Sequence, residues 1–334
     1  MTDFTSLEEI TTLLSVGLDT LGDGSPLASY LAHYRLAKLC QDDISLQVGN
    51  ITTARFRLWT QIWTPPAPRG TAIIVHGYYD HLGLYCHLLK LLLDEGLQVV
   101  LWDLPGHGLS SGERADIDDF DDYIDCLKDV QQYLDDEGLA KGPWIGLGQS
   151  TGAAILSTDA LTRGDDGHWS ALVLLAPLVR PMGWTRAAWV HSLVGPFIGS
   201  VPRRFRANTN DADFATFLRE HDPLQPVRLP TSWVSAMRRW IPRLMELPPN
   251  HIPTLILQGD QDLTVDGDWN LRVLEKKFLN ARVHRHNDAR HHLVNEAAPI
   301  RDELFEHVRD FLNERLPPSN RNANRQCSRA QDTH

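Results

Sequence analysis

The sequence predicts an α/β protein with a mostly parallel sheet, helices on both faces of the sheet, and a helical cap inserted between late strands. Two observations support this prediction. Short apolar runs, first at residues 71–75 and 98–102, alternate with stretches of helical periodicity, which is typical of parallel strands covered on both faces. This rhythm stops over residues 182–249 and then resumes, which predicts a cap over the top of the sheet.

Residues 1–54 are predicted to form a helical segment that packs on the core. Their helical periodicity is clearest over residues 30–39. Residues 55–63 then alternate between the two faces of a strand and stop at Pro65-Pro66. We therefore expect the sheet to begin with this strand.

The first part of the core is expected to span residues 55–181. Its first two helical stretches end at Gly96 and near Gly138, as glycine commonly ends a helix. The second of them begins with an acidic run, Asp116 to Asp125, which is interpreted as a solvated helix face that complements the helix dipole. The predicted strands cover residues 71–75, 98–102, 144–147 and 171–175, and the predicted helices cover 82–95, 118–134 and 153–161.

The predicted cap, residues 182–249, is rich in proline and tryptophan. The second part of the core, residues 250–316, begins where strands return at 254–258 and 282–286. It closes with an amphipathic helix over residues 299–316.

Composition and charge exclude several classes of function. The 334 residues have a formal net charge of -11, which argues against a nucleic-acid partner because phosphate neutralisation needs clustered Lys and Arg. The four cysteines are scattered without a C-x-x-C pair, so neither a disulfide framework nor a cysteine zinc site is expected.

The ends of the sequence carry no targeting or packing signal. The first residues lack the basic and apolar regions of a secretory signal, and no apolar run approaches the roughly 20 residues that span a membrane. A cytoplasmic protein is expected. Residues 317–334 have almost nothing to bury and are predicted to be disordered.

A Gly-x-Ser-x-Gly pattern at residues 148–152 offers a nucleophile. It stands between the apolar run at 144–147 and the small-residue run at 153–156, so it is expected to form a strand-to-helix turn. Such a turn presents the serine hydroxyl at the top of a sheet, with glycines where a Cβ would clash. Ser150 is therefore the candidate nucleophile.

A nucleophilic serine needs a histidine base and an acid that orients the histidine. Three acids follow the predicted strand at 254–258, and Asp262 is favoured because it lies far enough past the strand to turn back over the sheet edge. Asp260 is expected to cap the strand exit. Asp266 is expected to face solvent or cap a helix.

Two adjacent histidines, His291 and His292, follow the predicted strand at 282–286. One is expected to face the site and the other the solvent or the cap, and His291 is favoured as the base. His284 and His286 share a face of the strand, which makes a metal site conceivable. They lack carboxylate or thiolate partners at ligand spacing, so no metal is predicted.

The loop after the predicted strand at 71–75 offers an oxyanion donor. Backbone N–H groups usually bind the oxyanion, and the loop beginning His76-Gly77 is expected to lie beside the nucleophile. The N–H groups of Tyr78 and Thr151 are the candidate donors. The same residues are also compatible with a tight strand-to-helix turn.

These motifs, taken in order, resemble the α/β-hydrolase superfamily. Within it they are similar to the lysophospholipase and monoacylglycerol lipase branch, the serine aminopeptidase S33-like domain, over about residues 55–316. The resemblance implies the α/β-hydrolase fold, a triad of Ser150, Asp262 and His291, and Tyr78 and Thr151 as oxyanion donors. The motifs are His76-Gly77-Tyr78, residues 102–112, 148–152 and 259–262, and Ala289-Arg290-His291.

The resemblance also implies a serine hydrolase that needs no cofactor and cleaves carboxylic esters of acyl lipids, of the lysophospholipid or monoacylglycerol type. A general short-chain carboxylesterase, an S33-like peptidase and an acyltransferase remain alternatives because they use the same triad. Dehalogenases and epoxide hydrolases are disfavoured because Ser150 stands where they carry a carboxylate. A non-catalytic ligand-binding protein is disfavoured because every triad residue type is present in order.

The predicted cap is basic and aromatic. Residues 182–249 hold nine arginines and no lysine against five acids, a net charge of +4. Such a lid suits an acyl tail with an anionic head and a transient contact with lipid, although the arginines could equally pair with the acidic core domain. The candidate substrate-binding residues are Arg203, Arg204, Arg206, Trp184 and Trp233.

Overall fold

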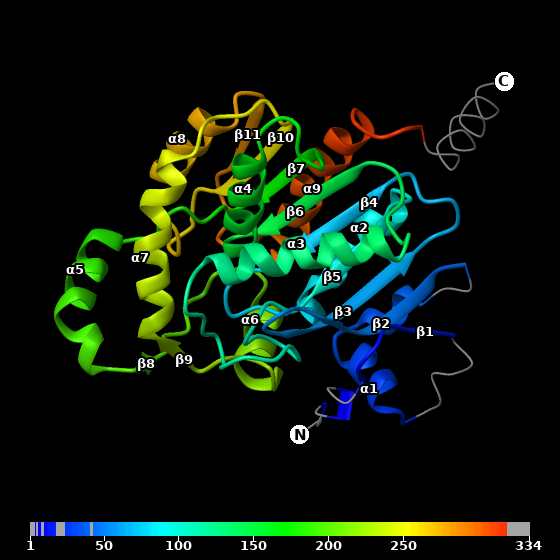
Figure 1. The fold of residues 1–334 in the computed structure, drawn as a ribbon, viewed down its shortest axis with the longest axis horizontal. Helices are drawn as coiled ribbons and strands as arrows, with labels where there is room; N and C mark the ends of the chain where they lie inside the picture. Colours follow the sequence, from blue (N-terminus) through cyan, green and yellow to red (C-terminus); the bar gives the residue numbers. More distant parts are fainter. Residues whose placement is uncertain (1–3, 5, 8–9, 18–23, 41–42, 319–334) are drawn as a thin grey trace.

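A nine-stranded sheet forms the centre of the computed structural model, which describes residues 4, 6–7, 10–17, 24–40 and 43–318 (Figure 1). Six neighbouring strands run parallel and the three at one edge pair antiparallel, which confirms the predicted mostly parallel sheet. In sheet order the strands are β1 (Leu14–Val16), β2 (Ser45–Thr52), β3 (Arg57–Thr64), β5 (Gln98–Trp102), β4 (Thr71–Val75), β6 (Trp144–Gln149), β7 (Trp169–Leu175), β10 (Thr254–Gly259) and β11 (Ala281–His286).

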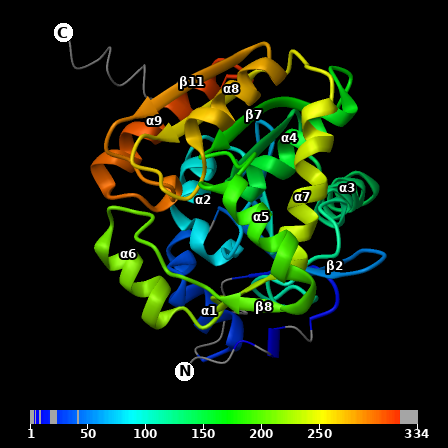
Figure 2. The same ribbon diagram turned by 90° about the vertical axis from the view of Figure 1, so that its left-hand side faces the viewer.

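Helices cover both faces of this sheet, as the apolar strands require (Figures 1 and 2). Each helix layer buries its apolar side chains in a core cluster of its own. One layer holds α1 (Pro26–His33), α2 (Cys86–Asp94) and α9 (Ala298–Asn313), and the other holds α3 (Asp121–Asp136), α4 (Thr151–Arg163) and α8 (Gly267–Lys277).

The N-terminal segment differs from the prediction. Helix α1 and a 3-10 helix at Leu36–Leu39 occupy the expected helical stretch, but residues 45–52 form strand β2, with β1 paired to it. The expectation of a helical segment over residues 1–54 is therefore wrong for this part. Leu46 and Val48 are buried on either side of the half-buried Gln47, which is the start of a period-two pattern that favours a strand.

The segment between β7 and β10 contains helices, as expected, and also a small antiparallel sheet that was not predicted. Helix α5 lies beside α7 outside the main layers (Figures 1 and 2). The elements are α5 (Trp184–Val194), β8 (Ser200–Pro202), α6 (Ala212–Thr216), β9 (Arg228–Pro230) and α7 (Thr231–Glu246).

Helix α7 is only partly a cap element. The Trp240 ring stacks on Phe120 with 4.2 Å between ring centroids, and its Nε1–H donates a 2.9 Å hydrogen bond to Thr158 Oγ1 of α4. The second half of α7 therefore packs on the core layer. The division of the chain at residues 182 and 249 stays a prediction.

Three smaller expectations concern the chain as a whole. In the described part of the chain, Cys40, Cys86 and Cys126 carry free thiols. Among the helices described, none is long and apolar enough to cross a membrane. The tail predicted to be disordered, residues 317–334, lies outside the described residues from residue 319 onward.

Candidate active site

A strained turn at Ser150 joins β6 to α4. Ser150 has φ +54° and ψ -110°, a backbone conformation that costs a non-glycine residue about 1–3 kcal/mol. A Cβ on Gly152 would overlap the Val75 carbonyl, and one on Gly148 would meet the backbone of α4. The two glycines therefore allow the turn to pack closely against β4 and α4, and this turn places the serine at the carboxyl end of the sheet.

The structure brings Ser150, His291 and Asp262 into one hydrogen-bonded chain. His291 Nε2 lies 3.0 Å from Ser150 Oγ, and His291 Nδ1 lies 2.7 Å from Asp262 Oδ2. An ionised carboxylate only accepts hydrogen bonds, so Nδ1–H donates to Asp262 and Nε2 accepts from the serine hydroxyl. All three side chains are buried, and Ser150 is 8% exposed.

Asp262 is held as a carboxylate by the loop after β10. Its Oδ1 accepts the Thr264 and Val265 N–H groups at 2.7 and 3.2 Å, and its Oδ2 accepts Gln258 Nε2–H at 3.0 Å. Burial acts to raise the pKa of Asp262, but His291 and these donors outweigh it and lower the pKa below its usual value.

The two alternative acids point elsewhere. Asp260 pairs with Arg285 of β11 at 2.6 Å. Asp266 caps the N-terminus of α8 and pairs with Arg180, in agreement with the helix-cap alternative. Of the three acids after β10, only Asp262 contacts His291 among the described residues.

The neighbouring histidines also separate. Burial acts to lower the pKa of His291, but the Asp262 carboxylate outweighs it, and the pKa of His291 is raised. The His291 carbonyl accepts a 2.8 Å hydrogen bond from Gln149 Nε2, which links the histidine loop to the serine turn. His292 turns away, and its Nε2 lies 3.2 Å from Asp80 Oδ1.

The loop that carries Tyr78 is fixed by a buried polar network. The Gly77 N–H donates to Tyr85 Oη at 3.0 Å, and the Tyr85 hydroxyl donates to Asp80 Oδ2 at 2.9 Å. The N–H groups of Tyr78 and Thr151 donate no hydrogen bond to any residue that the structure describes. They are therefore free to bind an anion.

The predicted substrate-binding residues fall into two groups. Trp233, 6% exposed, stacks on Tyr78 with 4.0 Å between ring centroids, and the Arg203 guanidinium lies 4.1 Å from the centroid of the Tyr79 ring. These two contact the candidate oxyanion loop. The others do not: Arg206 donates to the Leu263 carbonyl, Trp184 is partly buried against the core, and Arg204 is exposed.

The acidic run at the start of α3 is not merely a solvated face. Arg239 of α7 pairs with Asp119 at 3.0 Å, and Arg243 pairs with Asp119 and Asp121 at 2.7 and 2.8 Å. Two of the nine arginines in residues 182–249 therefore neutralise acidic side chains of the core domain.

Sequence reasoning missed a buried contact between three distant segments. Asp222 of the inserted segment lies 3.0 Å from His81 Nε2, and its other oxygen accepts the Tyr34 hydroxyl at 2.9 Å. No sequence signal marks Asp222 among the acids of the insertion, because its partners stand 141 and 188 residues away. This contact ties the loop after β4 to the inserted segment.

The sheet topology and the strained serine turn define an α/β hydrolase. Residues 66–298 match the family described as serine aminopeptidase, S33. Because this match covers more than half of the chain, the protein belongs to that family.

The chain is similar to several lipid hydrolases. It is 29% identical to the human monoglyceride lipase over 77% of this chain and 87% of the relative. It is 24% identical to the phospholipase YtpA of Bacillus subtilis over 77% and 99%. A monoglyceride lipase structure from Saccharomyces cerevisiae shares the fold at a TM-score of 0.69, with 16% identity, 80% of this chain and 95% of that chain covered.

Proposed function

We propose that the protein is a serine hydrolase that cleaves the carboxylic ester of a monoacylglycerol through an acyl-enzyme on Ser150. The observation that carries the proposal is the unbroken chain Ser150–His291–Asp262, with distances of 3.0 and 2.7 Å. A serine in this arrangement loses its proton to the histidine as it attacks a carbonyl carbon. The similarity to monoglyceride lipases supports the substrate class.

The four steps of the reaction follow from the roles of these side chains. Ser150 Oγ attacks the ester carbonyl while His291 Nε2 takes the hydroxyl proton. The imidazolium, stabilised by Asp262, gives this proton to the departing glycerol oxygen. Water then enters, loses a proton to His291 and attacks the acyl-enzyme. The resulting tetrahedral intermediate collapses as the imidazolium returns this proton to Ser150 Oγ, which releases the fatty acid and restores the free serine.

The oxyanion that forms in both halves of the reaction is assigned to the N–H groups of Tyr78 and Thr151. Thr151 is the first residue of α4, where the helix dipole favours negative charge. Tyr78 is held by its stacking on Trp233 and by a 2.7 Å hydrogen bond from its hydroxyl to the Ala115 carbonyl. Preorganised donors of this kind stabilise charge as it develops.

The contacts of the arginines favour a neutral head group over a phosphate. Arg203 donates to Gln225 Oε1 at 2.6 Å and to the Pro226 carbonyl at 3.1 Å, and Arg239 and Arg243 pair with acids of the core. These guanidinium groups already have protein partners. A lysophospholipid remains the second candidate substrate, supported by the similarity to a phospholipase.

A panel of substrates tests this function. We expect kcat/KM to be higher for a monoacylglycerol than for lysophosphatidylcholine or p-nitrophenyl acetate, and no cleavage of an aminoacyl p-nitroanilide. A different outcome is that lysophosphatidylcholine is the better substrate and that Arg204→Ala lowers its hydrolysis without lowering that of the monoacylglycerol. The enzyme would then recognise the phosphate of the head group instead. Preferred cleavage of the anilide would make it a peptidase.

Exposed apolar side chains on α5 and the turn after it support contact with lipid. Phe197 is 87% exposed, Trp189 65% and Leu193 55%, and such a patch marks an interaction surface. We expect Phe197→Ser to reduce co-sedimentation with phosphatidylcholine vesicles while hydrolysis of a soluble ester is unchanged. Equal co-sedimentation of both proteins would contradict the proposed contact.

A further inference from the structure

A second cluster of histidines and a carboxylate lies between the edge strand β11 and helix α9. Alternate residues of β11 face α9, because His284 approaches Glu303 of α9 and Arg282 pairs with Glu314, the residue that caps the C-terminus of this helix. Arg285, which stands between His284 and His286, instead pairs with Asp268 of α8 on the other face. The histidines of β11 therefore point at a single helix.

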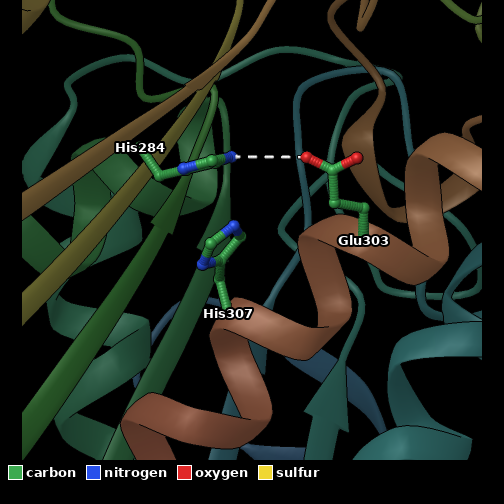
Figure 3. Close-up of side chains that lie close together, drawn as sticks. All are labelled: His284, Glu303 and His307. Atoms are coloured by element: carbon green, nitrogen blue, oxygen red, sulfur yellow. Dashed lines mark ion pairs between the residues drawn. The ribbon is translucent and has the colours of Figure 1, made fainter.

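Helix α9 presents two further ligand-forming side chains to His284. Glu303 and His307 stand four residues apart, so they lie on one face of the helix, one turn from each other. Ligand atoms of His284, Glu303 and His307 all lie within 4.8 Å of one another, and Figure 3 shows the three side chains converging.

The three groups do not satisfy each other by hydrogen bonding. His284 Nε2 is buried and has no hydrogen-bond partner among the described residues, and the nearest Glu303 oxygen lies 3.9 Å away. The rings of His284 and His307 are 3.7 Å apart between centroids. A buried polar atom without a partner is costly, and two imidazoles beside a carboxylate form a set that one cation can satisfy.

His286 orients the carboxylate of this cluster. Its Nδ1 accepts the N–H groups of Asp288 and Ala289, each at 3.2 Å, so its proton is on Nε2. That Nε2 lies 3.5 Å from Glu303 Oε2, while the other oxygen of Glu303 faces His284. Such an outer partner commonly fixes the orientation of a metal-binding carboxylate.

We propose that His284, Glu303 and His307 bind one zinc ion, with water as the fourth ligand. Two imidazoles and one carboxylate suit zinc, which takes four ligands at about 2.0–2.2 Å for N and O. Small shifts of the side chains would bring the ligand atoms to this spacing. A surface pocket of about 310 Å³, lined by His284, His307 and Asp310, lies beside the cluster and gives solvent access.

The proposed ion joins two separate elements, strand β11 and helix α9, which indicates a structural role. It would fasten the C-terminal helix to the edge strand, and it uses none of the residues assigned to ester cleavage. Sequence reasoning missed the site because Glu303 and His307 belong to a separate amphipathic helix.

Zinc titration of the full chain, produced without a histidine tag and treated with a chelator, tests the proposal. We expect isothermal titration calorimetry to give one zinc ion per chain. We also expect cobalt, as a substitute, to show the intense visible absorption of a four-coordinate site. Absence of stoichiometric zinc binding would overturn the proposal.

Matched variants locate the ion. We expect Glu303→Gln and His307→Ala to weaken zinc binding at least about tenfold, and His286→Ala to weaken it by about 10–100-fold. Glu306→Gln, on the exposed side of the same helix turn, should bind as the parent protein does. Unchanged affinity in Glu303→Gln, or loss of binding in His291→Ala instead, would overturn the assignment. Circular dichroism verifies that each variant is folded, and hydrolysis of a soluble ester adds a second check for every variant except His291→Ala.

Discussion

Two clusters of histidine and carboxylate side chains lie near β11, one within the strand and one in the loop that follows it. They differ in how many of their polar atoms have a hydrogen-bond partner. In the loop beyond β11, His291 has Ser150 on one ring nitrogen and Asp262 on the other, at 3.0 and 2.7 Å. Within the strand, His284 Nε2 has no hydrogen-bond partner among the described residues and lies 3.9 Å from Glu303. The first cluster is complete without an ion, whereas the second leaves a nitrogen unbonded that the proposed cation would bind.

The surroundings of the two carboxylates explain this difference. Asp262 is buried and accepts hydrogen bonds from Thr264, Val265 and Gln258, so it is fixed before any substrate arrives. The side chain of Glu303 is 55% exposed and has histidines as its only ion-pair partners in the described part of the chain. Preorganisation favours proton transfer in the first cluster, and accessibility favours an ion in the second.

Removing the base should have the largest effect. We expect His291→Ala to lower kcat by about 10⁶-fold, as loss of a triad base does in a serine protease. His251→Ala removes a histidine from an exposed pair with Asp165 and is the matched control. Ester hydrolysis followed by p-nitrophenol release measures both variants. A His291→Ala variant within tenfold of the parent rate would contradict the proposed base.

Removing the charge of the acid should have the next largest effect. We expect Asp262→Asn to lower kcat by about 10⁴-fold, because the amide no longer holds His291 with the proton on Nδ1. Glu303→Gln makes the same chemical change in the other cluster and should leave kcat unchanged. Equal losses in the two variants would remove the distinction between the clusters.

The pH profile reports on the same histidine. The base must be neutral, and the pKa of His291 is raised above its ordinary 6.5 by Asp262. We therefore expect kcat/KM to fall about tenfold per pH unit below an inflection that lies above 6.5. An inflection below 6.5 in a stopped assay would show that the carboxylate does not act on this ring.

Zinc should act on stability through the second cluster alone. At a free zinc concentration of 100 times Kd, binding to the folded state adds about 2.7 kcal/mol to the free energy of unfolding. We expect a higher Tm by scanning calorimetry in the parent protein and no rise in Glu303→Gln. The same rise in both proteins would place the ion elsewhere.

The smallest effect is expected for the ion pairs that join α7 to α3. Arg239→Ala removes a partly exposed pair with Asp119, and such pairs contribute about 0–1 kcal/mol. Urea unfolding should show a change of this size, with no change in substrate preference. A selective loss of lysophospholipid hydrolysis would instead show that this arginine binds the head group.

The sequence predicted the parallel strands better than the strands of the antiparallel edge and of the inserted segment. The strands at residues 71–75 and 98–102 were predicted at the bounds that β4 and β5 have, because every residue in them is buried. Strand β2 was missed because its period-two pattern is interrupted by buried Gly49 and Asn50. The β8–β9 pair was missed because its three-residue strands carry too little pattern.

The residues of the candidate sites also divide into those that could be predicted and those that could not. Ser150, Asp262 and His291 could be singled out because each stands on a loop that directly follows an apolar strand, where motif and order both point to it. Asp222 and Glu303 could not be paired with their partners because those contacts depend on how distant elements pack. Contacts between residues that stand in motifs were therefore predictable, and contacts between residues outside any motif were not.

Labelling with a fluorophosphonate probe tests the central claim most directly. Intact mass spectrometry of the treated protein should show one adduct per chain, and peptide mapping should place it on Ser150. The Ser150→Ala variant, folded by circular dichroism, should remain unlabelled. An unlabelled parent protein, or equal labelling of the variant, would contradict the assignment of Ser150 as the nucleophile.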